Sequence, residues 1–230
     1  MRRRISGPEC GVNRMAIAEP INAPPRSEAT TIPVCFIIVI VFEIRSKKCK
    51  VRARIHNFAH MNNAAITTCV AFTGHRTYNH EANRLLRHTV LSLHSAGKHT
   101  FLSGMAAGFD MAAAEAVLDC RTARTDIRLV AVIPFRGQEE RFSSHDRIRY
   151  EQILAEADET VILSEYYTRG VYAVRNDYLI AHAATLITWY DGSTGGTRYT
   201  VERALAQRRK LIHLHPSTPL SVYPDPELFL

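Results

Sequence analysis

The feature that most constrains the fold is a regular alternation of short apolar segments with longer amphipathic ones, which begins near residue 67. The apolar segments predict strands at 68–73, 100–102, 127–133, 160–163, 185–189 and 210–214. Apolar residues at helical spacing predict helices between them, at 79–96, 111–119, 146–157, 174–183 and 199–207. Apolar strands separated by helices are typical of a parallel sheet covered on both faces. We therefore predict an α/β fold with a Rossmann-like, doubly wound, mainly parallel sheet.

Glycine-bearing loops follow three of the predicted strands. Doubly wound sheets bind ligands beyond the carboxyl ends of their strands, at a switch point in strand order. Glycines there let the backbone approach a ligand, and the N–H groups that open the next helix favour a phosphate or carboxylate. The candidate ligand residues in these loops are Gly74, His75 and Arg76; Ser103, Gly104, Gly108 and Asp110; and Asp191, Gly192, Gly195, Gly196 and Thr197.

Each loop also has a structural interpretation. Arg76 can pair with a phosphate in a bidentate manner, whereas His75 suits a structural hydrogen bond as well as a ligand contact or a proton-transfer role. The loop at 103–110 matches neither G-x-G-x-x-G nor a P-loop, so a tight turn before a helix is its alternative. The loop at 191–197 is interpreted as a second anion cradle, with a flexible surface loop as the alternative.

Other polar and aromatic residues are expected near the same edge. Gln138 and Arg141 could read a base or a second phosphate; the alternative is a solvated helix start with Asp146 as its cap. The pair Arg175 and Asn176 either clamps the ligand or ties loops together by hydrogen bonds. For most of a group of four tyrosines, partly buried packing is expected rather than stacking on a base: Tyr166, Tyr167, Tyr172 and Tyr178.

These motifs together resemble a known family. The segments are Thr-Gly-His-Arg (73–76), Ser-Gly-Met-Ala-x-Gly-Phe-Asp (103–110), Pro-Phe-x-Gly-Gln (134–138), Arg-Asn (175–176) and Asp-Gly-x-x-Gly-Gly-Thr-x-Tyr-Thr (191–200). In this order they resemble the YpsA-like branch of the SLOG superfamily, which includes DprA/Smf proteins and LOG-type phosphoribohydrolases. The resemblance implies a Rossmann-like domain that binds nucleotides or nucleotide-derived ligands and requires no other cofactor.

One departure from the LOG-type pattern bears on activity. Those enzymes carry a glutamate about three residues after their glycine-rich loop, where this chain has Thr200, and its first acid is Glu202. Cleavage of an N-glycosidic bond needs a carboxylate near the developing oxocarbenium ion, and Asp110 and Asp191 are the candidates. We expect a nucleotide sensor or adaptor, with a nucleotide hydrolase as the first alternative and a DprA-like single-stranded DNA-binding protein as the second.

Charge and cysteine content complete the expectations. Residues 1–65 hold eleven Lys and Arg against four acids, which accounts for the whole net charge of +7. The remaining chain is neutral, so we expect nucleic acid not to be a partner. No Cys/His cluster has metal-ligand spacing, so no metal is expected, and the five cysteines favour a reduced, cytoplasmic protein. We expect Cys69 and Cys120 to be buried thiols.

The chain is expected to divide into a nucleotide-binding domain at 66–216, a C-terminal strap at 217–230 and a basic, irregular extension at 1–65. The extension's apolar run at 33–44 is too short to span a membrane as a helix. It fits a lone strand, a weak membrane-surface anchor or a segment that is not natively translated, and we favour the last, with initiation at Met61. No membrane span is expected, and homo-oligomerisation stays open.

Overall fold

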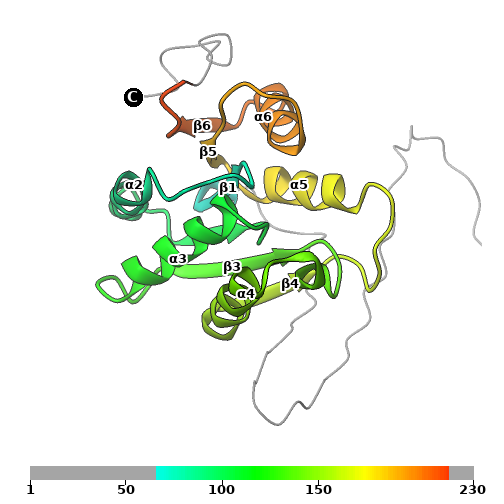
Figure 1. Ribbon diagram of the computed structural model, residues 1–230. Helices are drawn as coiled ribbons and strands as arrows, with labels where there is room; N and C mark the ends of the chain where they lie inside the picture. The colour runs from blue at the N-terminus through cyan, green and yellow to red at the C-terminus, as the bar shows by residue number, and fades with distance from the viewer. Residues whose placement is uncertain (1–65, 218–230) are drawn as a thin grey trace, which may run out of the picture. The chain divides into compact units, whose positions relative to one another are not determined.

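The computed structural model describes residues 66–217. They form a six-stranded sheet of order β4-β3-β2-β1-β5-β6 in which every neighbouring pair is parallel (Figure 1). The predicted α/β, Rossmann-like fold is confirmed. The interpretations of residues 1–65 and of nearly all of the C-terminal strap lie outside the described residues.

The strands agree closely with the sequence-based predictions. Five of the six differ from their predicted bounds by one or two residues, and the strand at 185–189 has the predicted bounds. The strands are β1 (Cys69–Gly74), β2 (Thr100–Ser103), β3 (Arg128–Ile133), β4 (Glu159–Ile162), β5 (Thr185–Trp189) and β6 (Lys210–His213). The four inner strands, β3, β2, β1 and β5, are covered on both faces, and β4 and β6 form the edges of the sheet.

The helices also occur where they were predicted, but their amino ends do not. They are α2 (Asn83–Ser95), α3 (Phe109–Arg121), α4 (Ser144–Glu156), α5 (Val171–His182) and α6 (Gly196–Ala206), with a 3₁₀ helix η2 (Gln138–Arg141) before α4. The sequence placed the start of the first helix too early and the starts of the other four too late. Three of the late starts follow a glycine N-cap, at Gly108, Gly170 and Gly195.

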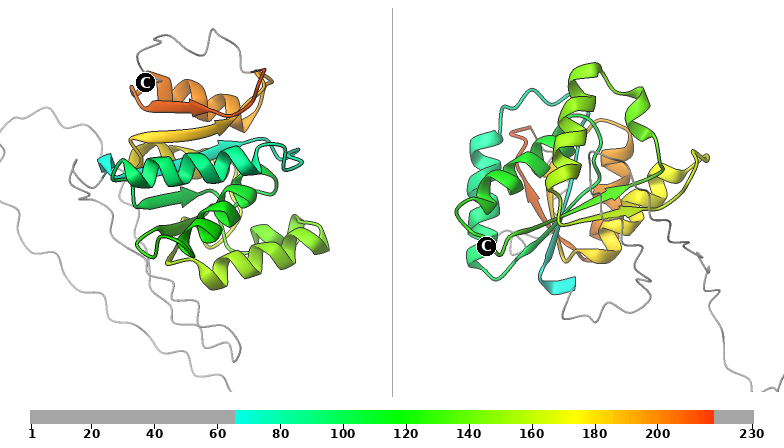
Figure 2. Two further views of the ribbon diagram at one scale, coloured as in Figure 1. Left: turned by 90° about the vertical axis from the view of Figure 1, so that its left-hand side faces the viewer. Right: turned by 90° about the horizontal axis from the view of Figure 1, so that it is seen from below.

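Two apolar cores lie on the two faces of the sheet. One joins alternate residues of β1, Val70 and Phe72, to buried residues of α2, α3 and α4. The other joins Cys69 and Ala71 to residues of α5 and α6. Figure 2 shows these two helix layers from the side and from below. As expected, Cys69 and Cys120 are buried thiols.

The strand order changes direction beside β1. The chain builds β1 to β4 outward on one side and then crosses to place β5 on the other side of β1. The carboxyl ends of β1 and β5 therefore flank the switch point, because Gly74 pairs in register with Trp189. This is the position at which open α/β sheets bind ligands.

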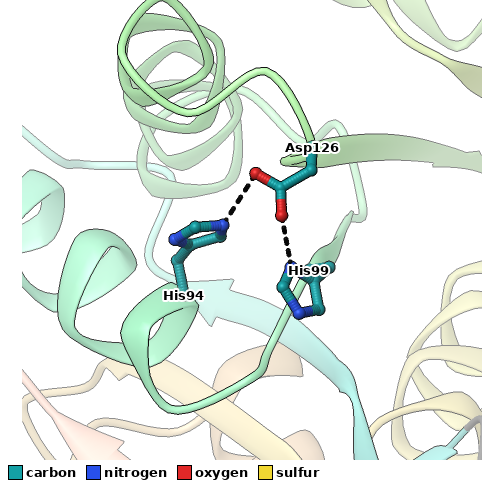
Figure 3. Close-up of side chains that lie close together, drawn as sticks. All are labelled: His94, His99 and Asp126. Atoms are coloured by element: carbon teal, nitrogen blue, oxygen red, sulfur yellow. Dashed lines mark hydrogen bonds and ion pairs between the residues drawn. The ribbon is translucent and has the colours of Figure 1, made fainter.

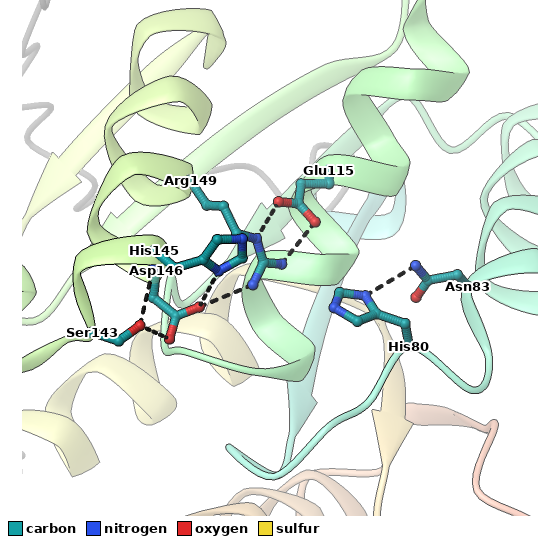
Figure 4. A network of polar contacts seen from close by, with 7 residues as sticks. All are labelled: His80, Asn83, Glu115, Ser143, His145, Asp146 and Arg149. Atoms are coloured by element: carbon teal, nitrogen blue, oxygen red, sulfur yellow. Dashed lines mark hydrogen bonds and ion pairs between the residues drawn. The ribbon is translucent and has the colours of Figure 1, made fainter.

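The segment before α4 corrects two predictions. The N-cap of α4 is Ser143, not Asp146: the Ser143 hydroxyl accepts the Asp146 N–H at 3.1 Å and donates to the Asp146 carboxylate. The helix also begins at Ser144, two residues before its predicted start at 146, and Ile148 on it is 57% exposed. Arg149 instead ties α4 to α3 through a bidentate pair with Glu115, with both N···O distances 2.8 Å (Figure 4).

Within residues 66–217, no helix combines the length and the apolar character that crossing a membrane requires.

Candidate ligand-binding site at the carboxyl edge

The loops after β1 and β5 meet at the switch point. Nε2 of His75 lies 2.9 Å from Oδ1 of Asp191 and 3.2 Å from the backbone nitrogen of the same residue. A neutral imidazole can accept from that N–H, whereas a protonated Nε2 donates to the carboxylate. Either way, His75 joins two strands that are more than a hundred residues apart in the sequence.

The β5 loop is shaped by its own carboxylate. The Ser193 N–H donates to Oδ1 of Asp191 at 2.8 Å, which closes a tight turn. Hydrogen bonds from Ser193 and the nearby His75 lower the Asp191 pKa to about 2. Gly192 and Gly195 have φ angles of 95° and 139°, so the chain needs glycine here. Asp191 is therefore an exposed, ionised residue at the switch point.

The β2 loop packs tightly against the β1 loop. Gly108 has a φ of 91°, and a side chain there would overlap the backbone of Arg76. The Phe109 N–H donates to the His75 carbonyl at 3.1 Å, so the start of α3 is fixed to the β1 loop. The buried Ser103 hydroxyl donates to the Asp110 carbonyl at 2.8 Å and accepts the Met105 N–H. Ser103 therefore holds the turn rather than facing solvent.

Asp110 and Arg175 form a buried ion pair beneath this loop. Nη1 of Arg175 is 3.2 Å from Oδ2 of Asp110, and both side chains are less than one-tenth exposed. Burial raises the Asp110 pKa to about 6, although Arg175 and the N–H groups of Ala106 and Gly74 oppose this rise. Oδ1 of Asp110 and Nε of Arg175 have no well-formed hydrogen bond within the described structure. The pair retains hydrogen-bonding capacity below the loop.

Two adjacent residues of α5 form hydrogen bonds to the β2 loop and to the β5 loop. Nη1 of Arg175 donates to the Gly104 carbonyl, and Nδ2 of Asn176 donates to the Gly196 carbonyl at 3.4 Å. The loop-tying interpretation of this pair thus has direct geometric support. One rigid helix fixes the spacing between the β2 loop and the β5 loop, so the two loops form a single preorganised frame.

Three helices that begin at this edge have a glycine at the N-cap and therefore no side-chain cap. Their N-cap residues are Gly108, Gly170 and Gly195, and none offers an oxygen to the first N–H groups. By contrast, α4 is capped by Ser143. Helix amino ends carry partial positive charge and unsatisfied donors. The edge therefore provides several backbone donors for an anion, most openly at α6, where Gly195 and Gly196 are exposed.

An aromatic cluster extends the site toward β3 and β4. The rings of Phe135, Tyr167 and Tyr172 have centroids 5.4 to 6.3 Å apart. The Arg141 guanidinium lies 4.8 Å from the Tyr167 ring centroid, and Arg76 lies 5.6 Å from that of Tyr172. All five residues follow strand ends, so the cluster shares the edge with the glycine loops.

The sequence-based expectation for the tyrosines was only partly right. Tyr172 and Tyr178 are half-buried, but Tyr166 and Tyr167 are 80% and 50% exposed. Phe135, which anchors the cluster, was not singled out. Its position directly after a strand, within the segment 134–138, was the available signal.

Gln138 lies inside the protein rather than at the surface. Its side-chain amide donates to the Met105 carbonyl at 3.2 Å and contacts the Tyr150 hydroxyl at 3.3 Å. It is 2% exposed. Its direct interaction in this structure is therefore with the β2 loop, while the neighbouring Arg141 is exposed.

The residues at the expected position of a LOG-type glutamate have other roles. Thr200 is fully buried, and its hydroxyl donates to the Gly196 carbonyl at 2.8 Å. Glu202 is exposed and pairs with Arg198 one turn earlier in α6, with an N···O distance of 2.7 Å. Of the two catalytic candidates, Asp110 is buried in its ion pair, whereas Asp191 is the accessible carboxylate.

Comparisons with known proteins agree with this geometry. The uncharacterised SPbeta prophage-derived protein YoqJ of Bacillus subtilis is 28% identical over 52% of this chain and 78% of its own length. A UPF0398 protein of Bacillus cereus strain B4264 is 30% identical over 42% of this chain, which spans about half (54%) of that relative. The X-ray structure of DNA processing protein A from Streptococcus pneumoniae has a TM-score of 0.50 at 21% identity, covering 69% of this chain and 54% of that one.

The last of these likenesses concerns the fold alone. A family model covers nearly all of the described residues: the model YpsA, described as the YspA SLOG family, matches residues 70–215. That range includes every strand except the first residue of β1, all three glycine loops and the aromatic cluster. The chain therefore belongs to the YpsA family of SLOG proteins.

Proposed function

We propose that this protein binds a nucleotide or nucleotide-derived ligand at the carboxyl edge of its sheet and acts as a sensor or adaptor. The observation that carries the proposal is the pair Arg175 and Asn176, which fixes the Gly104 and Gly196 loops to one helix. A frame held in this way binds without ordering its loops first, and this saves conformational entropy.

The phosphate is assigned to the frame between these loops. The uncapped start of α6 offers N–H donors, and Arg76 from the β1 loop supplies an exposed positive charge. The ionised Asp191 lies on the same loop and would repel a phosphate placed against it. It suits a ligand hydroxyl, such as that of a ribose, better than a phosphate oxygen.

The base is assigned to the aromatic cluster. Tyr167 presents a half-exposed ring that is backed by Phe135 and flanked by Arg141. Stacking of a base on such a ring contributes about 1–3 kcal/mol. The glycine frame is assigned a phosphate and the aromatic cluster a base. The ligand must therefore contain a phosphate and a base, as a nucleotide does.

Binding assays with a nucleotide panel test this assignment. We expect Arg76→Ala and Tyr167→Ala each to weaken the affinity for the tightest nucleotide roughly tenfold, which corresponds to about 1.4 kcal/mol. Arg124→Ala, on the exposed turn after α3, and Tyr166→Ala, next to the cluster, are the matched controls and should bind as the wild type does. Equal effects of variants and controls would contradict the site.

Hydrolysis of the ligand is the rival function. Asp191→Asn is the appropriate test because Asp191 is exposed, whereas substitution of Asp110 would disturb a buried ion pair. Release of base or phosphate by the wild type, lost in a folded Asp191→Asn protein, would establish a hydrolase. Binding without turnover supports the sensor or adaptor.

Binding of single-stranded DNA is the second alternative function to be tested. A DNA processing protein shares this fold, so the neutral charge of the domain is no longer sufficient ground to set nucleic acid aside. Salt-sensitive binding of single-stranded DNA that competes with the nucleotide would favour this rival.

A further inference from the structure

A second cluster of functional side chains lies at the opposite edge of the sheet. His94 is in the last turn of α2, His99 directly precedes β2, and Asp126 is in the turn before β3 (Figure 3). Because the strands are parallel, their amino ends lie away from the glycine loops. No part of the proposed nucleotide site includes these three residues.

The donor atoms of the cluster converge on a small volume. Nε2 of His94 is 2.9 Å from Oδ1 of Asp126, and Nδ1 of His99 is 2.9 Å from Oδ2. One ligand atom from each residue lies within 4.8 Å of the other two. Zinc holds nitrogen and oxygen ligands at about 2.0–2.2 Å, which in a tetrahedron places neighbouring ligand atoms about 3.3–3.6 Å apart. Each imidazole nitrogen lies 2.9 Å from a carboxylate oxygen, so these contacts need to widen by only about 0.5 Å to admit the ion.

One nitrogen of the cluster contacts the carboxylate without a well-aligned hydrogen bond. Nδ1 of His99 is shielded from solvent and lies close to the carboxylate, yet it forms no well-aligned hydrogen bond within the described structure. A buried polar atom without a hydrogen bond is costly and usually has an explanation. A bound cation would provide one, because a neutral imidazole nitrogen is a metal ligand.

Rigid elements hold the cluster in place. The Arg128 N–H donates to the His99 carbonyl at 2.8 Å, and Thr100 pairs in register with Arg128. His99 and Asp126 thus lie just before the neighbouring strands β2 and β3. His94 is 12% exposed and keeps its position against Asp126, while the Asp126 side chain is exposed. The cluster is therefore both preorganised and accessible to an ion.

We propose that His94, His99 and Asp126 bind a divalent transition-metal ion of the zinc class, with water completing its coordination. Two imidazoles and one carboxylate are a ligand set that zinc accepts, and three protein ligands leave one position open. The ion would clip the end of α2 to the starts of β2 and β3. No spacing pattern predicted this site, because the ligands come from three segments that only the fold brings together.

Zinc titration of the tag-free full chain tests the proposal. We expect calorimetry to give one equivalent with a micromolar or tighter dissociation constant, and cobalt to give visible absorption bands in its place. His94→Gln and Asp126→Asn should each weaken zinc binding at least tenfold, since loss of metal-site residues has effects of about 10–100-fold or more. His88→Gln, an exposed histidine on the same helix, is the control and should bind normally.

A second readout separates the metal from a simple charge cluster. Zinc should raise the melting temperature of the wild type and of His88→Gln, and it should not raise that of folded His94→Gln. Absence of binding at micromolar zinc, or binding that His94→Gln and Asp126→Asn leave unchanged, would overturn the site and leave Asp126 as an ion-pair partner of two histidines. Nucleotide binding should be the same in all four proteins.

Discussion

Nη1 of Arg175 lies 3.2 Å from Oδ2 of Asp110, and this buried ion pair connects α5 to the first turn of α3. The same guanidinium donates to the Gly104 carbonyl. The pair thus links a helix from each face of the sheet directly below the glycine loop. Because the Arg175 guanidinium also holds the Gly104 carbonyl, the shape of the proposed site depends on this buried ion pair.

Removal of the arginine should cost stability in a pH-dependent way. In Arg175→Met the Asp110 carboxyl loses its cation, and breaking a buried pair on one side costs roughly 3–5 kcal/mol. The Asp110 pKa, already raised to about 6, should rise further. Because protonation then relieves the cost, urea unfolding should show a smaller loss at pH 5.5 than at pH 8.

The double variant Arg175→Met with Asp110→Leu is the control. It removes both charges, so it should recover part of the lost stability and should not share the pH dependence. A single Arg175→Met protein as stable as the wild type at pH 8 would show that the ion pair does not support the fold.

Two glycines with positive φ angles allow a comparison of substitutions, and Gly108 also has a ψ of −126°, outside the left-handed helical region. Gly97 and Gly108 have φ angles of 82° and 91°, but a Cβ on Gly97 meets open space, whereas one on Gly108 overlaps the Arg76 backbone. Gly97→Ala should lower the free energy of unfolding by roughly 1–2 kcal/mol, the cost of placing an alanine at a positive φ angle. Gly108→Ala should cost clearly more or prevent folding, as measured by urea unfolding. Equal costs would mean that the β1 and β2 loops can separate.

The sequence predicted the strands better than the starts of the helices. The strand at 185–189 was predicted with its observed bounds because a short, uncharged run rich in β-branched and aromatic residues between helices has few alternatives. Helix α3 begins two residues before its predicted start because tertiary contacts, such as the Phe109 N–H to the His75 carbonyl, extend it to Gly108. The helix propensities of the local residues cannot predict such a tertiary contact.

The glycine loops lie at the carboxyl edge of the sheet, as the sequence predicted, but the partners of their residues were not predictable. Arg175 and Asp110 are 65 residues apart, and no pattern in the sequence pairs them. Gln138 is polar and follows a strand, which indicated a surface residue, yet the fold buries it against the β2 loop. The glycines identify the loops, whereas side-chain pairing depends on the packing of α5 over them.

The β5 loop should depend on the oxygen of Asp191 rather than on its charge alone. Asp191→Asn keeps Oδ1 as an acceptor for the Ser193 N–H, whereas Asp191→Ala removes it. Amide hydrogen exchange at Ser193 should therefore be faster in Asp191→Ala and little changed in Asp191→Asn. In the wild type the Asp191 pKa of about 2 keeps the carboxylate ionised. Protection should thus stay constant from pH 7 down to about pH 4, close to the usual pKa of Asp.

Acid sensitivity should come in part from His213 at the end of β6. Burial lowers its pKa to about 4, and Nδ1 lies 2.7 Å from the Thr188 hydroxyl oxygen. An unfolded histidine has a pKa near 6.5, so between about pH 6.5 and 4 the unfolded chain binds more protons. The contribution of His213 is complete above that window and is lost as the pH falls through it, by roughly 3 kcal/mol at most.

Asp110 acts in the opposite direction over part of the same window. Its raised pKa means that the folded state binds more protons between about pH 4 and 6, so this group alone stabilises the protein as the pH falls. His213→Gln keeps a polar side chain for Thr188 but does not titrate, and Asp110 is unchanged in it. The difference between the two proteins therefore isolates His213: the wild type should lose more stability than His213→Gln from pH 7 to 4.5, and the exposed His88→Gln control should follow the wild type. Parallel profiles for wild type and His213→Gln would show that this histidine is not held neutral by burial.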